Sequence, residues 1–153
     1  MPNLELKIPP VAVFLLFAAV MWITAAVTAD YSFNGVFRVT LIVLVLAASA
    51  VFGLAGVFSF KRAGTTVHPL KPERSSSLVT GGIYRLSRNP MYLALLLALL
   101  AWGLYLSSLY ALAIAVLFAP WMNRFQIEPE ERTMEKMFAQ EFLDYCKATR
   151  RWL

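Results

Sequence analysis

Two long apolar stretches early in the chain predict two membrane-spanning helices. The first, residues 11–29, has no charged side chain until its end is passed and, at about 1.5 Å per residue, can cross the ~30 Å hydrocarbon core of a bilayer. The second, residues 37–58, carries one charge, on Arg38, at its end, from which a long side chain can reach the lipid headgroups. Small residues inside the second stretch favour close packing against another helix. They are Ser49, Gly53 and Gly56.

A third apolar block, residues 91–122, predicts a helical hairpin instead of one long helix. A straight helix of this length would measure about 48 Å, well beyond the ~30 Å of a bilayer core. The polar pair Ser107 and Ser108 is the best place for a turn, which leaves two spans over residues 91–106 and 109–122. Both arms are shorter than the usual ~20 residues, so we expect the ends of the hairpin to lie in the headgroup region.

The positions of the basic residues predict how the chain is oriented in the membrane. Lys and Arg are concentrated in the loop 59–90 and the tail 123–153, whereas the connection between the first two spans has only Asp30 and Arg38. By the positive-inside rule, both termini and the loop are therefore cytoplasmic. We expect residues 1–153 to form a single all-α domain, an integral membrane bundle of about four transmembrane helices with a cytoplasmic C-terminal helix.

The overall composition agrees with this class of protein. The 153 residues are 59% hydrophobic and only 15% charged, which is too apolar for a soluble domain. The net charge of +5 is explained by membrane topology and by contact with anionic lipids, so we expect no nucleic-acid partner. The single cysteine, Cys146, excludes an intramolecular disulfide, and with His68 as the only histidine we expect no metal site.

The start of the third span combines a helix signal with basic residues. We expect the Asn89 side chain to cap this helix and Pro90 to occupy its first position, where the missing N–H of proline does no harm. A helix N-terminus also attracts anions, and Arg85 and Arg88 strengthen this attraction. A carboxylate, a phosphate or a plain lipid headgroup fits these residues equally well.

The acidic sequence "EPEE" at residues 128–131 is typical of a helix start, with proline and acids in the first turn. On the helix that follows, an apolar stripe is predicted, and Glu131 lies near its centre. Two interpretations remain open for Glu131: a solvated acid near the helix dipole, or a carboxylate that faces Arg85, Arg88 or a cationic ligand. The stripe consists of Met134, Phe138, Phe142 and Tyr145.

Several motifs together resemble a known superfamily. "LVTGGIYRLSRNPMY", the apolar hairpin, "EPEER" and "MFAQEFLDYCKATRRWL" are similar in order and spacing to the isoprenylcysteine carboxyl methyltransferases and phospholipid methyltransferases, which are integral membrane enzymes. The resemblance covers about residues 64–153. It implies an S-adenosylmethionine site at the cytoplasmic end of the bundle, built from the loop 59–90 and the tail 123–153.

The resemblance also implies roles for individual residues. In the family, the loop before G-x-Y, the tyrosine of that motif, the R-H-P-x-Y motif and the first of two paired acids bind the cofactor. The corresponding cofactor-binding residues are Ser76, Ser77, Leu78, Val79, Tyr84, Asn89, Pro90, Met91, Tyr92 and Glu130. Arg88 and Glu131 are the implied catalytic residues, and Arg124 is the implied substrate contact.

Two positions depart from the family pattern. Asn89 stands where the family has histidine, so it can position a group by hydrogen bonding but cannot exchange protons as an imidazole does. Gln126 falls near the spacing of the family's substrate-contacting arginine, and Arg124 is the nearest guanidinium. These departures leave the identity of the substrate open.

The sequence leads to one functional hypothesis and two alternatives. The first is S-adenosylmethionine-dependent methyl transfer, at the cytoplasmic membrane face, to a lipophilic acceptor: a prenylcysteine-like carboxylate, an isoprenoid or a phospholipid. The first alternative is an NADPH-dependent membrane reductase of related architecture. The second is a non-enzymatic membrane scaffold that binds lipid.

Overall fold

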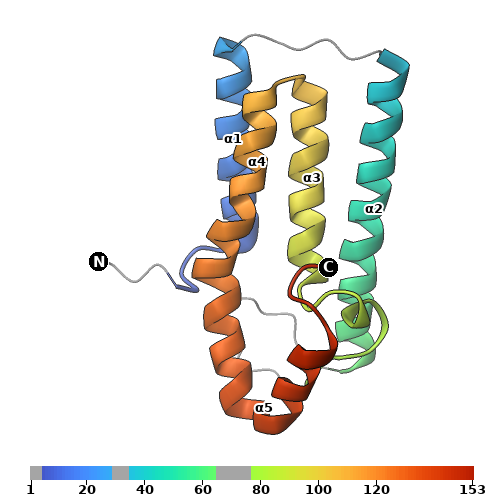
Figure 1. The fold of residues 1–153 in the computed structure, drawn as a ribbon, viewed down its shortest axis with the longest axis vertical. Coiled ribbons are helices and arrows are strands. Elements are labelled where there is room, and N and C mark those ends of the chain that lie inside the picture. Colours follow the sequence, from blue (N-terminus) through green and yellow to red (C-terminus); the bar gives the residue numbers. More distant parts are fainter. Residues whose placement is uncertain (1–4, 29–34, 65–76) are drawn as a thin grey trace.

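A computed structural model describes residues 5–28, 35–64 and 77–153, and the regular structure in these ranges is helical, without strands (Figure 1). Ser76 and His68 therefore lie outside the described residues. The helices are α1 (Pro10–Val27), α2 (Gly35–Arg62), the short 3₁₀-helix η2 (Gly82–Arg85), α3 (Pro90–Leu106), α4 (Leu109–Met122), the π-helical segment η3 (Asn123–Ile127) and α5 (Glu128–Ala148).

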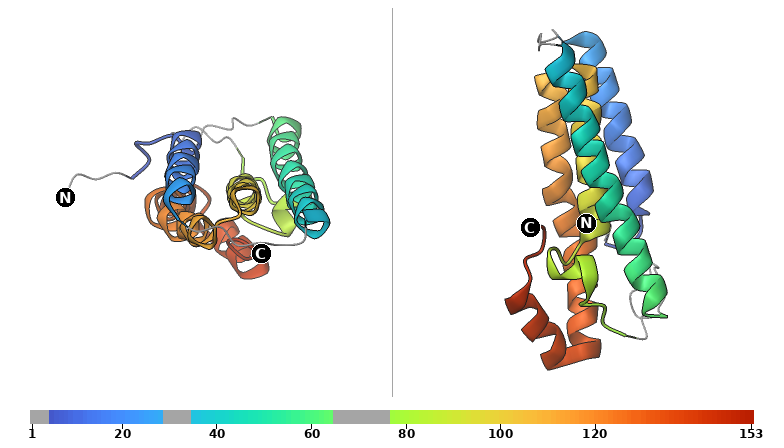
Figure 2. Two further views of the ribbon diagram at one scale, coloured as in Figure 1. Left: turned by 90° about the horizontal axis from the view of Figure 1, so that it is seen from above. Right: turned by 90° about the vertical axis from the view of Figure 1, so that its right-hand side faces the viewer.

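Helix α3 lies in the middle of the bundle, between α2 on one side and α1 with α4 on the other (Figure 2). Small residues let α2 approach α3 closely, as the sequence predicts. Ser49 Oγ donates a hydrogen bond to the Ala94 carbonyl of α3 at 2.8 Å. At Gly56, a Cβ atom would lie only 2.8 Å from Met91 Cγ, so a larger residue would push the two helices apart.

The structure confirms the four predicted apolar helices and the turn between α3 and α4. Ser107 adopts a left-handed conformation with φ of 53°, and Ser108 Oγ accepts a hydrogen bond from Ala111 N at 3.3 Å, which caps α4. Arg38, at the start of α2, donates a hydrogen bond to Ser107 Oγ. This end of α2 is therefore tied to the hairpin turn.

Two of the helices, α1 and α2, are long and apolar enough to cross a membrane by length and composition, whereas α3 is a shorter apolar helix. Their apolar side chains mostly face outwards. Only 6% of the apolar window of α2 is buried, and Leu44 and Leu54 are 60% and 61% exposed. The core helix of a soluble protein would bury such side chains, so this surface suits a lipid environment.

Helix α5 begins at Glu128, as predicted, but its N-terminus is not free, because α4, η3 and α5 follow one another without a break. The amide of Glu128 already donates to the Asn123 carbonyl, as in a π-helix. Pro129 has no N–H to offer to the carbonyl of Phe125, and the amide of Leu6 binds that carbonyl at 3.0 Å. The acids of this turn therefore do not lie at a free helix N-terminus, so attraction to the positive end of a helix dipole contributes little to their stabilisation.

Helix α5 is also not straight, contrary to the single stripe predicted on it. Ala139 has φ of 42° and ψ of −116°, a conformation that alanine rarely adopts. After this kink, the second half of α5 turns back towards the bundle (Figure 1). Met134 and Phe138 are thus separated in direction from Phe142 and Tyr145, of which Phe142 is buried.

Candidate functional site

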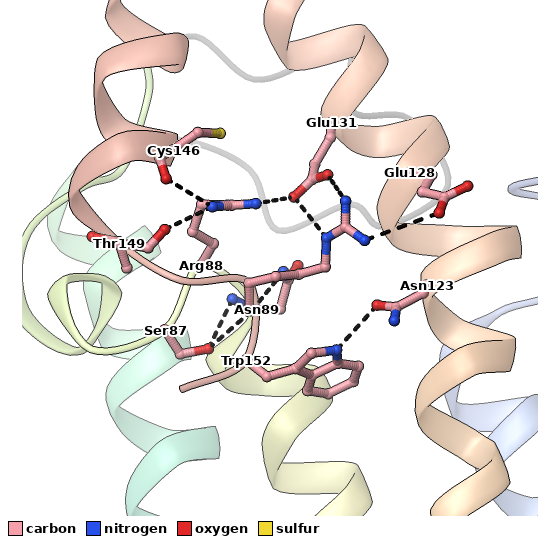
Figure 3. A network of polar contacts seen from close by, with 10 residues as sticks. Ser87, Arg88, Asn89, Asn123, Glu128, Glu131, Cys146, Thr149 and Trp152 are labelled. Atoms are coloured by element: carbon pink, nitrogen blue, oxygen red, sulfur yellow. Dashed lines mark hydrogen bonds and ion pairs between the residues drawn. The ribbon is translucent and has the colours of Figure 1, made fainter.

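Three parts of the chain meet beneath α3: the loop that leads into α3, the first turns of α5, and the last residues of the chain. After the kink at Ala139, the last residues of the chain return to the loop before α3. Arg88 N donates a hydrogen bond to the Arg150 carbonyl at 3.0 Å, although the two residues are 62 positions apart in the sequence. Figure 3 shows the polar side chains that gather here.

A carboxylate held by two arginines forms the centre of this network. Arg88 Nη2 lies 2.7 Å from Glu131 Oε1, and the two side chains are only 12% and 19% exposed. Arg151 contacts the same carboxylate through Nη2 to Oε2 at 2.5 Å and Nε to Oε1 at 3.2 Å. The predicted pairing of Glu131 with Arg88 is therefore confirmed, whereas Arg85, the other predicted partner, is exposed.

Arg88 also holds the end of α5. Its Nη1 donates to the carbonyls of Cys146 at 3.2 Å and of Thr149 at 2.6 Å (Figure 3). Carbonyls at a helix C-terminus lack intrahelical donors and carry partial negative charge, so a guanidinium is a favourable partner for them. One residue thus joins the loop before α3 to both halves of α5.

The predicted cap of α3 by the Asn89 side chain is wrong. Asn89 makes no side-chain cap hydrogen bond to α3, and its Nδ2 donates to the Arg151 carbonyl at 3.0 Å instead. Its own backbone N–H is bound by Ser87 Oγ at 3.1 Å. Pro90 does occupy the first position of α3, as predicted. The amide side chain therefore serves a long-range contact to the C-terminal residues.

Glu130 has a different environment from its neighbour Glu131. It is partly buried, and its Oε1 accepts a hydrogen bond from the Tyr92 hydroxyl. Burial raises the pKa of the Glu130 carboxyl to about 8, and the negative charge of Glu131 adds to this, while the Tyr92 hydrogen bond opposes it. Among the described residues, no cation lies within ion-pair distance of Glu130.

The two adjacent acids are therefore prepared for different tasks. Glu131 is neutralised by two arginines and is held in a fixed orientation. Glu130 has no cationic partner among the described residues, and its pKa of about 8 lies near neutral pH. Such an arrangement suits the binding of a positively charged ligand at Glu130.

Tyr84, from the G-x-Y motif, is buried beside this pair. Its ring contacts that of Phe60 at a centroid distance of 5.4 Å, and its carbonyl accepts a hydrogen bond from the Tyr145 hydroxyl at 2.7 Å. Burial raises the pKa of the Tyr84 hydroxyl above its ordinary value, and Tyr145 and Glu130 add to this effect. Tyr84 therefore stays neutral and acts as a packing and hydrogen-bonding group.

The other described residues among the predicted cofactor contacts lie in the loop before η2 and at the start of α3. Ser77, Leu78 and Val79 are partly buried ahead of η2, and Met91 lies partly buried against Gly56. Within the described part of the chain, two buried donors of this region lack a hydrogen-bond partner: Ser77 Oγ and Arg88 Nε. Buried polar groups are normally paired, so unpaired ones indicate a place for a ligand or water.

Arg124, the predicted substrate contact, is not gathered with these residues. It is 57% exposed and lies 2.7 Å from Glu5, which also contacts Arg132 at 2.5 Å. Gln126, at the alternative position, is fully buried and donates from Nε2 to the Ile8 carbonyl at 2.6 Å. Both residues tie the N-terminal segment to η3.

Sequence reasoning missed the contribution of the last residues of the chain. Arg151 was counted only as part of a basic tail, and Trp152 was assigned no role, yet both contact the network. Tyr145 was predicted only as a member of an apolar stripe. No local sequence pattern predicts these contacts, because each forms only when the chain turns back after Ala139.

A groove of about 510 Å³ opens beside the network, lined mainly by Thr80, Arg85, Glu141 and Tyr145. In the described ranges, no group of three or more His, Cys, Asp or Glu side chains is arranged to hold a metal ion. The polar chemistry described here consists of carboxylates, guanidinium groups and hydroxyls.

Comparison with known proteins identifies the family. Residues 37–141, more than half of the chain, match the family model described as phospholipid methyltransferase. The chain is 44% identical to an uncharacterized protein of Haemophilus influenzae over 63 residues. The aligned part makes up 41% of this chain and the whole of that protein. No solved structure matches the chain. The match spans α2, α3, α4 and the turn that carries both acids, and the chain therefore belongs to the phospholipid methyltransferase family of membrane proteins.

Proposed function

We propose that this protein catalyses S-adenosylmethionine-dependent methyl transfer to a lipophilic acceptor at the cytoplasmic face of a membrane. The observation that carries this proposal is the contrast between two neighbouring acids. Glu131 is paired with two arginines, whereas Glu130 is partly buried and, among the described residues, has a tyrosine hydroxyl as its only partner. Family membership supports a membrane methyltransferase, and the cofactor and acceptor are the proposed part.

The residues at the site fit the cofactor chemically. Glu130 offers a carboxylate to the cationic amino group, and the unpaired donors Ser77 Oγ and Arg88 Nε offer hydrogen bonds to its oxygen atoms. Two further predicted cofactor residues, Tyr84 and Tyr92, are buried, and the Tyr92 hydroxyl contacts Glu130. When bound, the cofactor supplies an activated methyl group on a sulfonium.

The predicted catalytic residues Arg88 and Glu131 act in this proposal by fixing the geometry of the site. Methyl transfer requires the acceptor to be held in line with the methyl group, and such orientation contributes strongly to rate. Arg88 donates three hydrogen bonds, one to Glu131 and two to carbonyls at the C-terminal end of α5, and these fix the positions of both groups relative to the loop before α3. The outward-facing apolar surfaces of α1 and α2 favour an acceptor delivered by the lipid phase.

Calorimetry of the purified protein in detergent distinguishes the proposal from both alternatives. We expect saturable binding of S-adenosylhomocysteine and no binding of reduced nicotinamide nucleotide. Binding of the nicotinamide nucleotide instead would favour the membrane reductase. If neither ligand bound to folded protein, the scaffold that binds lipid would become the better hypothesis.

The lipophilic acceptor is tested by a second assay. Membrane extract is incubated with the protein and a methyl donor carrying a radiolabel, and the lipids are then separated. We expect label in the lipid fraction, where its position distinguishes prenylcysteine-like carboxylates, isoprenoids and phospholipids. Label confined to water-soluble small molecules would exclude a lipophilic acceptor.

The four-span topology with both termini cytoplasmic is part of the proposal. It rests on the distribution of Lys and Arg along the chain. We expect single cysteines at Ser32 and Ser75, in a Cys146→Ser background, to be labelled from opposite sides of the membrane. Both positions lie outside the described residues. Labelling of both from one side would contradict the four-span arrangement.

A further inference from the structure

The last five residues, 149–153, form a segment that we name the C-terminal latch. Its backbone is held by the loop before α3: the Arg150 carbonyl accepts from Arg88 N at 3.0 Å, and the Arg151 carbonyl accepts from Asn89 Nδ2 at 3.0 Å. Ser87 Oγ adds a longer contact to the Arg151 carbonyl at 3.4 Å. The latch is thus attached to the residues that lead into the central helix.

A second attachment joins the latch to the π-helical segment. Trp152 Nε1 donates to Asn123 Oδ1 at 3.0 Å (Figure 3), and the indole packs against the buried core of the bundle. A tryptophan placed with its ring in an apolar environment and its N–H satisfied is a strong local anchor. The latch therefore connects α3, η3 and the end of α5.

Arg151 is the side chain through which the latch reaches the site. It contacts both oxygens of Glu131, and its Nη1 lies 4.0 Å from Glu128 Oε1. A guanidinium that bonds both oxygens of a carboxylate fixes the plane of that carboxylate, which a single bond from Arg88 does not. The orientation of Glu131, next to Glu130 in the chain, therefore depends on Arg151.

The part of the chain that carries the latch follows a kink. The second half of α5 starts after Ala139, whose backbone lies in a sparsely populated region. Beyond this kink, the described hydrogen bonds back to the site come from the Tyr145 hydroxyl on the Tyr84 carbonyl, from the two carbonyls bound to Arg88, and from the latch itself. Phe142 is also buried. A local opening can break and remake such hydrogen bonds.

We propose that Arg151 is a positioning residue of this site, and that the C-terminal latch holds the second half of α5 closed against it. Arg151 acts through Glu131 and touches no reacting atom. This proposal rests on the proposed function in one respect: an open latch is expected to weaken cofactor binding. The closure itself is tested independently of any cofactor.

Cys146 is a natural reporter of this closure. It is the only cysteine of the chain, is partly buried, and lies in the second half of α5, after the kink, beside Arg88. We expect Arg151→Met to increase the rate at which a maleimide labels Cys146 by severalfold or more. Arg150→Met is the matched control, because it removes the same charge from the neighbouring residue, whose side chain is exposed and whose backbone contact is kept.

The sign of this result separates opening from electrostatics. Burial raises the pKa of the Cys146 thiol, and the positive charge of Arg151 partly offsets this. Removing that charge alone raises the pKa of the thiol further, lowers the fraction of reactive thiolate and slows the labelling. Faster labelling of Arg151→Met therefore reports greater access to the thiol.

The binding arm uses S-adenosylhomocysteine. We expect it to slow the labelling of Cys146 in the wild type, to bind about tenfold more weakly to Arg151→Met, and to bind normally to Arg150→Met. The groups that face Glu130 are Tyr92 of α3, Tyr84 of η2 and Glu131. With Arg151 gone, the charge of Glu131 is less compensated, so the pH midpoint of binding should also rise. Arg151→Lys, which keeps the charge, should restore this midpoint.

The outcomes separate the two proposals. A wild type that binds no S-adenosylhomocysteine, but whose Cys146 is exposed by Arg151→Met, would contradict the proposed function and keep the latch. Equal labelling rates for Arg151→Met and Arg150→Met in folded protein would overturn the latch, whatever the cofactor does. If Arg151→Met does not fold, Trp152→Phe, which removes the hydrogen bond to Asn123, provides the same comparison, and a wild-type labelling rate in that variant would equally overturn the latch.

Discussion

Replacing Glu130 by glutamine is expected to weaken the binding of S-adenosylhomocysteine by more than about tenfold near pH 8, because a charge-assisted hydrogen bond worth ~1.5 to 3 kcal/mol becomes a neutral one. Glutamine keeps the shape of the side chain and its contact with Tyr92. Calorimetry at several pH values measures the effect. Binding isotherms of the variant that overlay those of the wild type would remove Glu130 from the site.

The pH dependence of this binding carries a definite sign. Because the pKa of Glu130 in the free protein is raised to about 8, the carboxyl is mostly protonated at pH 6, and a cationic ligand must displace the proton. Wild-type affinity should therefore rise between pH 6 and pH 8, by up to about tenfold per pH unit, with release of a proton. The glutamine variant should show no such dependence.

The same substitution has an opposite effect on stability. A carboxyl whose pKa is higher in the folded than in the unfolded protein costs stability as the pH rises above the ordinary value of 4.5, and this cost reaches its maximum near the folded value of about 8. Glu130→Gln should therefore unfold at a higher temperature than the wild type at pH 8. The difference should vanish near pH 4. This gain in stability with loss of binding is typical of a residue kept for function.

The second large effect is expected for Glu131→Gln, which should destabilise the protein by about 3 to 5 kcal/mol because it leaves two partly buried guanidinium groups without their shared carboxylate. Arg88 and Arg151 would then repel each other. The apparent unfolding temperature in detergent measures the loss. Binding of S-adenosylhomocysteine should fall as well, since the geometry next to Glu130 is no longer held.

Glu128→Gln is the control for this prediction. Its carboxylate lies 4.0 Å from both Arg124 and Arg151 and is 40% exposed, so its loss should cost less than about 1 kcal/mol. In addition, Arg88→Met combined with Glu131→Gln should cost less than the sum of the two single changes, because both break one network. A Glu131 variant as stable as the Glu128 variant would contradict the network.

Part of this protein follows from local sequence alone. The apolar stretches predict α1, α2, α3 and α4, because a long apolar segment in a membrane must satisfy its backbone hydrogen bonds internally, as a helix does. The turn at Ser107 and Ser108 follows from helix length, and Pro90 at the first position of α3 follows from the geometry of proline. These features depend on neighbouring residues only. The sequence also offered Arg88 as one partner of Glu131, beside Arg85, a cationic ligand or plain solvent, and the structure shows the pair with Arg88.

The tertiary structure decided the rest, because the competing interactions join residues far apart in the chain. Helix α5 begins at Glu128 without a free N-terminus, because η3 runs directly into it and Leu6 supplies the N–H that the Phe125 carbonyl lacks after Pro129. Ala139 is a good helix former locally, yet its backbone is bent where the chain turns back and docks on the bundle.

The same reason explains the difference between expectation and structure at the site. Asn89 binds the Arg151 carbonyl instead of capping its own helix, because that carbonyl is brought within 3.0 Å by the returning chain. Arg151 itself looks like any basic tail residue until the chain reversal places it on Glu131. A local pattern ranks the conformations of a short segment, but the partner of a polar group is chosen by whichever distant element reaches it when the chain is folded.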